Sequence, residues 1–325
     1  TADIHRGGVF AQIVGTLACL PEHYKDMVKG FIINRFRGDI ALFNEGVKWI
    51  EQQTGKPVLG VLPWYSHFKI DAEDSVEIEK IHNFKQLDKN LPTVAIVRLP
   101  HIANFTDFHA LARIDSIQTV FIDSPDDLDR CAAVIIPGTK NTRKDLEWVT
   151  ARFEKALASY VRNGGHVLGI CGGYQMLGHV VKDPAGLEGS PGSTRGLGLL
   201  PVETTLQSPK TTTLSEFDWD GSTGRGYEIH MGATQLKAGA PFIRILSRNA
   251  VAVQKTDGCL APSGRVAGTY IHGFFDSGTV AEKWFAMVGM DPVPKMETDL
   301  AEEKDKDYDK LKQHMEKYLN MAAIR

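Results

Sequence analysis

His166-Val-Leu-Gly-Ile-Cys-Gly-Gly-Tyr-Gln-Met-Leu-Gly178 combines an apolar run, a glycine turn and a helical pattern around one cysteine. The apolar run Val167 to Ile170 predicts a buried strand, and the residues after Gly172-Gly173 predict a helix. The cysteine therefore lies at a sharp strand-to-helix turn, the nucleophile elbow usually written G-x-S-x-G and here read as Gly169-Ile-Cys171-Gly-Gly173. Glycines on both sides permit a strained backbone and the close approach of a substrate.

Cys171 has two interpretations. The N-terminus of a helix favours a thiolate, which is the reactive form of a cysteine nucleophile. A free cysteine is otherwise commonly a small buried residue that packs beneath a sheet. The glycines that flank Cys171 favour the nucleophile.

The composition limits the possible classes of protein. A chain of 325 residues is long enough for two domains, and 42% hydrophobic residues with a net charge of −3 indicate a globular protein without the positive footprint of a nucleic-acid binder. Its four cysteines are far apart and form no CxxC pair, so we expect neither a metal site nor a disulfide framework, and we expect a cytoplasmic location. No apolar run approaches the about 18 residues of a membrane helix, and no signal peptide is visible, so no membrane association is expected.

The order of patterns predicts an α/β fold with two domains. Residues 1–65 alternate helices and short buried strands, which indicates a parallel sheet that binds ligands at the carboxyl ends of its strands. Residues 66–91 are charged and weakly periodic and are predicted to form a linker. Residues 92–325 resume the alternation and then turn to shorter runs from Gly196, so the second domain is expected to have a mixed, mainly parallel sheet. An apolar stripe near the C-terminus predicts a helix that docks on its parent domain.

A thiol nucleophile needs a base, and two histidines are candidates. His272 follows a β-type run and precedes a glycine, so its ring can protrude from a strand end. The alternative is a histidine packed in a loop beneath the two phenylalanines that follow. His230 is the competitor, and Glu228 shares one face of a strand with it because side chains alternate. That pair either orients a substrate or a base, or forms a cross-linked polar face.

These stretches together resemble a known family. The elbow through Gln175, with the later Tyr-Ile-His272-Gly, resembles a class I, triad-type glutamine amidotransferase domain. Further stretches narrow the resemblance: Asp3-Ile-His-Arg-Gly-Gly-Val-Phe-Ala11, Lys29-Gly-Phe-Ile-Ile-Asn34-Arg-Phe-Arg-Gly38, Pro137-Gly-Thr-Lys-Asn-Thr142, Gly196-Leu-Gly-Leu-Leu-Pro201 and Gly226-Tyr-Glu-Ile-His230. In this order, and over nearly the whole chain, they resemble the cobyric acid synthases, a family of glutamine amidotransferases in cobalamin biosynthesis.

The resemblance implies a ligase that amidates peripheral carboxylates of a corrinoid, adenosylcobyrinic acid a,c-diamide, with ATP, Mg²⁺ and ammonia from the co-substrate glutamine. It implies that Cys171 attacks the glutamine carboxamide while His272 relays the proton. Backbone N–H groups near Gly138 and Gly172 would hold the oxyanion. Residues implied on the glutamine side are Gln175, Glu228 and His230.

For the first domain the resemblance implies part of a dethiobiotin-synthetase-like P-loop fold. Asn34 would then lie near the adenine, and Asp3 and Arg6 would lie near the phosphates or the corrinoid. No G-x-x-x-x-G-K-[ST] occurs in the chain, so we expect the amidase half to be intact and the ATP half to be incomplete. The missing N-terminal half-domain is then a candidate partner, beside glutamine and the corrinoid.

Two departures from the family pattern affect these expectations. The broader amidotransferase class has a glutamate two residues after its histidine, whereas this chain has Phe274, which predicts a Cys–His dyad. The third position of the family's D-I-D-R-G-G stretch is His5 here, so the carboxylate that the family has at this position is replaced by an imidazole. The alternatives are an amidotransferase for another substrate (cobyrinic acid or a cell-wall lipid precursor), a non-catalytic remnant, and a stand-alone cysteine hydrolase.

Overall fold

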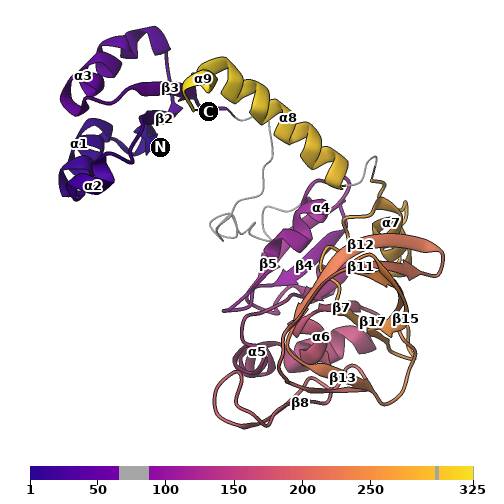
Figure 1. Ribbon diagram of the computed structural model, residues 1–325. Coiled ribbons are helices and arrows are strands. Elements are labelled where there is room, and N and C mark those ends of the chain that lie inside the picture. Colours follow the sequence, from indigo (N-terminus) through magenta and orange to yellow (C-terminus); the bar gives the residue numbers. More distant parts are fainter. Residues whose placement is uncertain (66–87, 297–299, 325) are drawn as a thin grey trace. The chain divides into compact units, whose positions relative to one another are not determined.

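The computed structural model describes residues 1–65, 88–296 and 300–324, which belong to two compact units. The first unit contains Thr1–Ile70 and Glu302–Arg325, and the second contains Asp71–Ala301 (Figure 1). Most of the predicted linker, 66–91, lies outside the described residues. None of the helices in the described ranges is both long and apolar enough to cross a membrane.

The first unit is a small parallel sheet with helices. Strands β1 (Ala2–Asp3), β2 (Phe31–Phe36) and β3 (Val58–Pro63) lie in that order and are parallel. Ile33 on the central strand and Ile50 on a helix are completely buried, because the strand is covered and the helix has an apolar face. The helices are η1 (Ile4–Arg6), α1 (Val9–Cys19), α2 (Glu22–Lys25), η2 (Ile40–Phe43) and α3 (Asn44–Thr54).

The C-terminal helices α8 (Leu300–Tyr318) and α9 (Met321–Ile324) meet the edge strand β3 of the first unit. The Asn320 N–H donates to the Leu59 carbonyl at 2.7 Å, and Gly60 forms an antiparallel bridge with Leu319. A Cβ on Gly60 would collide with the Tyr318 carbonyl oxygen, so this contact requires glycine. The sequence places residues 302–325 in the domain 92–325. In the structure, residues 302–325 instead belong to the first unit, because their backbone pairs with the edge of β3, which would otherwise be open.

The second unit is built on a six-stranded sheet in the order β16-β17-β7-β6-β4-β5. All neighbours from β17 to β5 are parallel, and β16 is antiparallel to β17. Strands β4 and β6 are buried along their whole length, as expected for a parallel sheet covered on both faces. The strands are β4 (Thr93–Val97), β5 (Gln118–Ile122), β6 (Ala133–Ile136), β7 (His166–Ile170), β16 (Cys259–Leu260) and β17 (Val266–Thr269).

Helices pack around this sheet and confirm the predicted α/β class (Figure 1). They are η5 (Phe105–Phe108), α4 (His109–Ala112), η6 (Leu128–Arg130), α5 (Thr142–Arg162), α6 (Gly172–Leu177) and α7 (Gly278–Met287). Asn141 caps α5 by accepting a hydrogen bond from the Lys144 N–H. Thr142 is the first residue of the helix, where it is buried.

Two smaller sheets complete the second unit. One is mixed, in the order β13-β10-β8-β9, and the other is antiparallel, in the order β12-β11-β14-β15. Strands β11 and β12 form a long hairpin that turns at Asp220-Gly221, both with positive φ, as a two-residue hairpin loop requires. The strands are β8 (Val180–Asp183), β9 (Gly192–Arg195), β10 (Val202–Thr205), β11 (Thr211–Trp219), β12 (Ser222–His230), β13 (Ala233–Leu236), β14 (Ile243–Arg248) and β15 (Val251–Asp257).

Candidate active site

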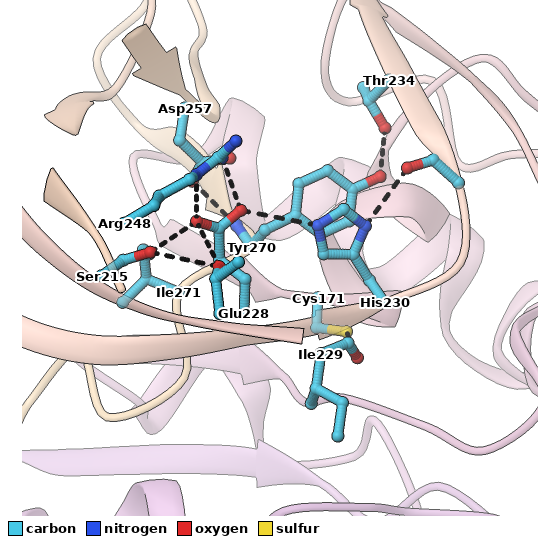
Figure 2. A network of polar contacts seen from close by, with 12 residues as sticks. Cys171, Ser215, Glu228, Ile229, His230, Thr234, Arg248, Asp257, Tyr270 and Ile271 are labelled. Carbon is cyan, nitrogen blue, oxygen red and sulfur yellow. Dashed lines mark hydrogen bonds and ion pairs between the residues drawn. The ribbon is translucent and has the colours of Figure 1, made fainter. Parts of the chain in front are cut away.

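Cys171 stands at the corner between β7 and α6, where the elbow was predicted. Its backbone has φ 52° and ψ −109°, a conformation that non-glycine residues rarely adopt and that often marks a functional site. A Cβ on Gly173 would collide with the Ile136 carbonyl oxygen, so the helix can begin this close to β6 only with glycine. The sulfur lies 3.7 Å from the Ile229 carbonyl oxygen, to which the thiol can donate (Figure 2).

His272 follows β17 and is fixed by strand β12. The His272 N–H donates to the Tyr227 carbonyl at 2.8 Å, the Tyr227 N–H donates back at 3.1 Å, and the two rings stack with centroids 5.0 Å apart. A Cβ on Gly226 would collide with the His272 carbonyl oxygen, so the pairing depends on glycine at this position. Strand β12 therefore holds His272 in place and also contacts the sulfur of Cys171 with the carbonyl of Ile229.

Asp107, in η5, gives the histidine a carboxylate partner that the sequence did not identify. One carboxylate oxygen lies 2.7 Å from His272 Nδ1, and the other accepts the Gly273 N–H at 3.0 Å. Burial opposes a charge on His272, but the ion pair and hydrogen bond with Asp107, helped by Cys171, raise the pKa of His272 to about 10. The predicted dyad thus differs from the structure, in which thiol, imidazole and carboxylate form a three-membered arrangement.

Gly138 and Gly172 lie beside this arrangement. A Cβ built on Gly138 would be 3.0 Å from Cε1 of His272 and 3.7 Å from Cβ of Cys171. A Cβ on Gly172 would be 2.6 Å from the Thr139 side chain, so the two glycine segments are in contact. The structure therefore brings together the two backbone segments whose N–H groups are predicted to hold an oxyanion.

Gln175 is buried in α6, and its side-chain amide forms hydrogen bonds with neighbouring groups of the protein. Its Nε2 donates to the Tyr270 hydroxyl at 3.0 Å and to the Met231 carbonyl at 3.3 Å, and its Oε1 accepts from Thr142 at 3.1 Å. These bonds tie α6 to α5 and to the end of β12. The side chain therefore connects the elements around the site, and its predicted role in holding glutamine stays a prediction.

Glu228 faces away from solvent and is held by a cation. Arg248 binds it in a bidentate manner at 2.9 and 2.7 Å, and the Ser215 hydroxyl donates to it at 2.7 Å (Figure 2). Burial opposes the charge, but the nearby His230 ring, the hydrogen bond from Ser215 and the ion pair with Arg248 lower the pKa of Glu228. These contacts fit the alternative in which Glu228 belongs to a cross-linked polar face.

His230 belongs to the same network. Its ring stacks on Tyr270 with centroids 3.7 Å apart, its Nδ1 donates to the Gly232 carbonyl at 3.2 Å, and its Nε2 lies 3.6 Å from Glu228 (Figure 2). The imidazole of His230 therefore makes its contacts with β12 and the residues around it. Of the two predicted histidine candidates, the geometry assigns the place beside Cys171 to His272.

Replacing Arg248 by methionine is expected to lower the free energy of unfolding by about 3 kcal/mol, because it leaves the Glu228 carboxylate buried without its cation. Urea unfolding monitored by circular dichroism measures this loss. Arg225→Met on strand β12 is the matched control, since Arg225 is exposed and its partner Glu216 is about half exposed, so the change should be about 0.5 kcal/mol or less. Equal losses in the two variants would contradict the structural role of the Glu228–Arg248 pair.

The predicted residues of the first unit lie at the carboxyl edge of its sheet. Asp3 and Asn34 are paired across β1 and β2, and both contact Arg35: the Asp3 carboxylate at 3.3 Å and the Asn34 side chain at 2.9 Å through the Arg35 N–H. Arg6 ends η1 and is exposed. Arg37 lies 4.3 Å over the ring of Trp64, a contact that the sequence did not suggest. Open α/β sheets bind ligands at this edge.

The residues of the first unit fit ATP and Mg²⁺ only in part. The edge offers arginines and an exposed aromatic ring, but the sequence holds no phosphate-binding glycine loop. Among the described residues no group of three or more His, Cys, Asp or Glu side chains could hold a metal ion.

Two protein families match the sequence of the chain. Residues 93–280 match the family described as the CobB/CobQ-like glutamine amidotransferase domain. Residues 3–78 match the family described as the CobQ/CobB/MinD/ParA nucleotide binding domain. The two matches follow one another in the same order as the two units.

Curated relatives match over most of the chain. A cobyric acid synthase of Chlorobium phaeobacteroides (strain BS1) is 44% identical over 99% of this chain and 66% of its own length. A cobyric acid synthase of Chlorobaculum tepidum is 47% identical over 87% of this chain and 58% of its own length. The chain thus spans about two thirds or less of the length of these relatives.

Solved structures with distant similarity include PurLQS from Thermotoga maritima, at 18% identity and a TM-score of 0.43 over 56% of this chain and 87% of that chain. A crystal structure of a glutamine amidotransferase has 16% identity and a TM-score of 0.44 over 61% of this chain and 99% of that chain. The family is shown by the match of residues 93–280 and by the curated relatives. The chain therefore belongs to the CobB/CobQ-like glutamine amidotransferase family, and its homologues are cobyric acid synthases.

Proposed function

We propose that this chain releases ammonia from glutamine at Cys171 and serves an ATP-dependent amidation of peripheral carboxylates on adenosylcobyrinic acid a,c-diamide. The observation that carries the glutaminase part is the buried contact of His272 with Asp107 directly beside a cysteine in an elbow conformation. The homologous cobyric acid synthases support the corrinoid substrate. The match of residues 3–78 to a nucleotide-binding family supports ATP as a co-substrate.

The proposed glutaminase reaction uses Cys171 as the nucleophile and His272 as the proton carrier. Because the pKa of His272 is raised to about 10, the ring holds the proton of the thiol on Nε2 when the sulfur attacks the carboxamide carbon, and the N–H groups near Gly138 and Gly172 hold the resulting oxyanion. The imidazolium then gives its proton to the nitrogen, the carbon–nitrogen bond breaks, and ammonia leaves a glutamyl thioester. His272 next takes a proton from water, which attacks the thioester and releases glutamate and the thiol.

Asp107 would act on this reaction through His272. Its carboxylate holds the proton of the ring on Nδ1, so Nε2 faces the reaction, and it stabilises the imidazolium that forms at each proton transfer. The second hydrogen bond of Asp107, to the N–H of Gly273, fixes the direction of the carboxylate. Asp107 is thus a positioning residue in the proposed mechanism.

Glutamate release from glutamine by the purified chain tests the proposal. We expect release that depends on Cys171, measured with and without ATP, Mg²⁺ and the corrinoid. Mass spectrometry of the corrinoid would show whether carboxylates become amides. Glutamate release with no amidation of this corrinoid would refute the substrate, whereas reaction with simple esters and none with glutamine would refute the glutaminase itself.

A further inference from the structure

Asn104 contacts the catalytic face of His272 and has no role in the mechanism above. Its side-chain Nδ2 lies 3.1 Å from Nε2 of the ring, the same nitrogen that must exchange a proton with Cys171. The residue directly precedes η5, so one short segment provides both the carboxylate on Nδ1 and the amide on Nε2. Its backbone has φ 53° and ψ 42°, a left-handed conformation that asparagine tolerates better than most residues.

The amide competes with the thiol in either protonation state of the ring. When the imidazole is neutral, its Nδ1–H donates to Asp107 and the lone pair of Nε2 accepts the Asn104 N–H, so Nε2 cannot accept the proton of the thiol. When the ring is an imidazolium, Nε2–H is a donor, and the Asn104 amide turned by half a rotation offers its oxygen in place of the thiolate. Only one partner can take the best geometry on Nε2 at a time.

The segment that carries Asn104 is clamped to its surroundings. The Ala103 N–H donates to the Gly138 carbonyl and the Lys140 N–H donates to the His101 carbonyl, both at 2.9 Å. The fully buried carboxylate of Asp145 accepts the backbone N–H of His101 at 3.2 Å and its Nδ1 at 2.7 Å. These hydrogen bonds fix the backbone that precedes Asn104 and connect it to the segment that contains Gly138.

We propose that Asn104 is a positioning residue that restrains the glutaminase at rest, its side-chain amide occupying the place on His272 that the amide nitrogen of glutamine must reach. The departing nitrogen receives its proton from Nε2, so it has to approach the atom that the Asn104 amide contacts. Turnover then requires that the side chain of Asn104 leave Nε2 when glutamine binds. This inference rests on the proposed function and adds its control.

Asn104→Gly tests the restraint, because it removes the amide and tolerates the left-handed backbone. We expect the rate of alkylation of Cys171 by iodoacetamide at neutral pH to rise about five- to tenfold, the effect of losing one competing neutral hydrogen bond. Peptide mass spectrometry assigns the alkylation to Cys171, and basal glutamate release should rise in the same direction. Asn249→Gly is the matched control, since Asn249 in the β14–β15 turn is also left-handed and its side chain accepts the backbone N–H of Leu214 on β11. Both rates should stay at the parent value there.

A second variant keeps the test decisive if the glycine variant folds poorly. Asn104→Asp keeps the shape of the side chain, but its carboxylate holds Nε2–H more strongly and repels the thiolate, so alkylation should become slower than in the parent. An unchanged or reduced alkylation rate in a folded Asn104→Gly protein, or an increased rate in Asn104→Asp, would overturn the restraint. Faster alkylation without glutamate release by any form would uphold the restraint and refute the proposed glutaminase.

Discussion

Cys171→Ser is expected to reduce glutamate release from glutamine by about 10³-fold or more while the fold is kept. A serine hydroxyl keeps its proton at neutral pH, whereas the cysteine thiol can transfer its proton to the adjacent imidazole, so the variant loses the nucleophile but almost no volume. A coupled glutamate assay measures the rate, and thermal unfolding checks that the protein is folded. This loss of activity is expected to be the largest of those predicted, because no other described thiol lies at the elbow to replace the nucleophile.

Cys19→Ser is the matched control for this variant, because Cys19 is an exposed free thiol at the end of α1. Its rate of glutamate release should equal that of the parent. Release at the parent rate from Cys171→Ser would refute the assignment of the nucleophile. Equal losses in both variants would indicate that serine substitution acts through stability instead of chemistry.

The elbow could be predicted because every feature it needs is local in sequence. An apolar run ending in Cys171, two glycines and a helical run after them predict the strand, the turn and the helix without reference to the rest of the chain. The backbone of Cys171 and the close contact of Gly173 with β6 agree with that pattern. His272 could be found for the same reason, since a β-type run delivers it to a glycine.

Asp107 and Asn104 could not be found in this way because their function depends on tertiary contacts. They precede His272 by 165 and 168 residues, and they lie in and before a short 3-10 helix with no motif of its own. Phe274 also misdirected the prediction, because it suggested that the histidine had no acidic partner. The available signal was weak: both residues follow β4, whose carboxyl end meets those of β6 and β7 in the parallel sheet.

Strand β11 and the C-terminal helix show two further limits. The sequence was not interpreted as a strand over Thr211–Trp219, although Asp220-Gly221 between two β-type runs is a strong hairpin signal. The apolar stripe of α8 correctly predicted a helix, but amphipathicity does not identify the surface that a helix covers. Its contact with β3 depends on the open edge of that strand and on Gly60, both of which are known only from the tertiary structure.

Asp107→Asn is expected to lower kcat/KM for glutamate release by about 10² to 10⁴-fold. The asparagine can donate its N–H to Nδ1 of His272, which moves the ring proton to Nε2, so that nitrogen can no longer accept the proton of Cys171. The measurement is initial-rate kinetics over a range of glutamine concentrations. A parent-like kcat/KM would show that the 2.7 Å contact between Asp107 and His272 does not serve catalysis.

The pH dependence of the same variant separates catalysis from stability. The pKa of His272, about 10, is raised above its ordinary value chiefly by Asp107 against the effect of burial, so the imidazolium that protonates the departing nitrogen persists until the pH rises through that value. Removing the carboxylate lowers this pKa, and the upper limb of the rate profile should move to lower pH in Asp107→Asn. Asp218→Asn removes a buried carboxylate that pairs with Arg244 on β14, so it should reduce stability but leave the limb in place. Because a loss of packing alone would lower the rate without moving the limb, a displaced limb in Asp107→Asn alone would identify Asp107 as the group that sets the proton affinity of His272.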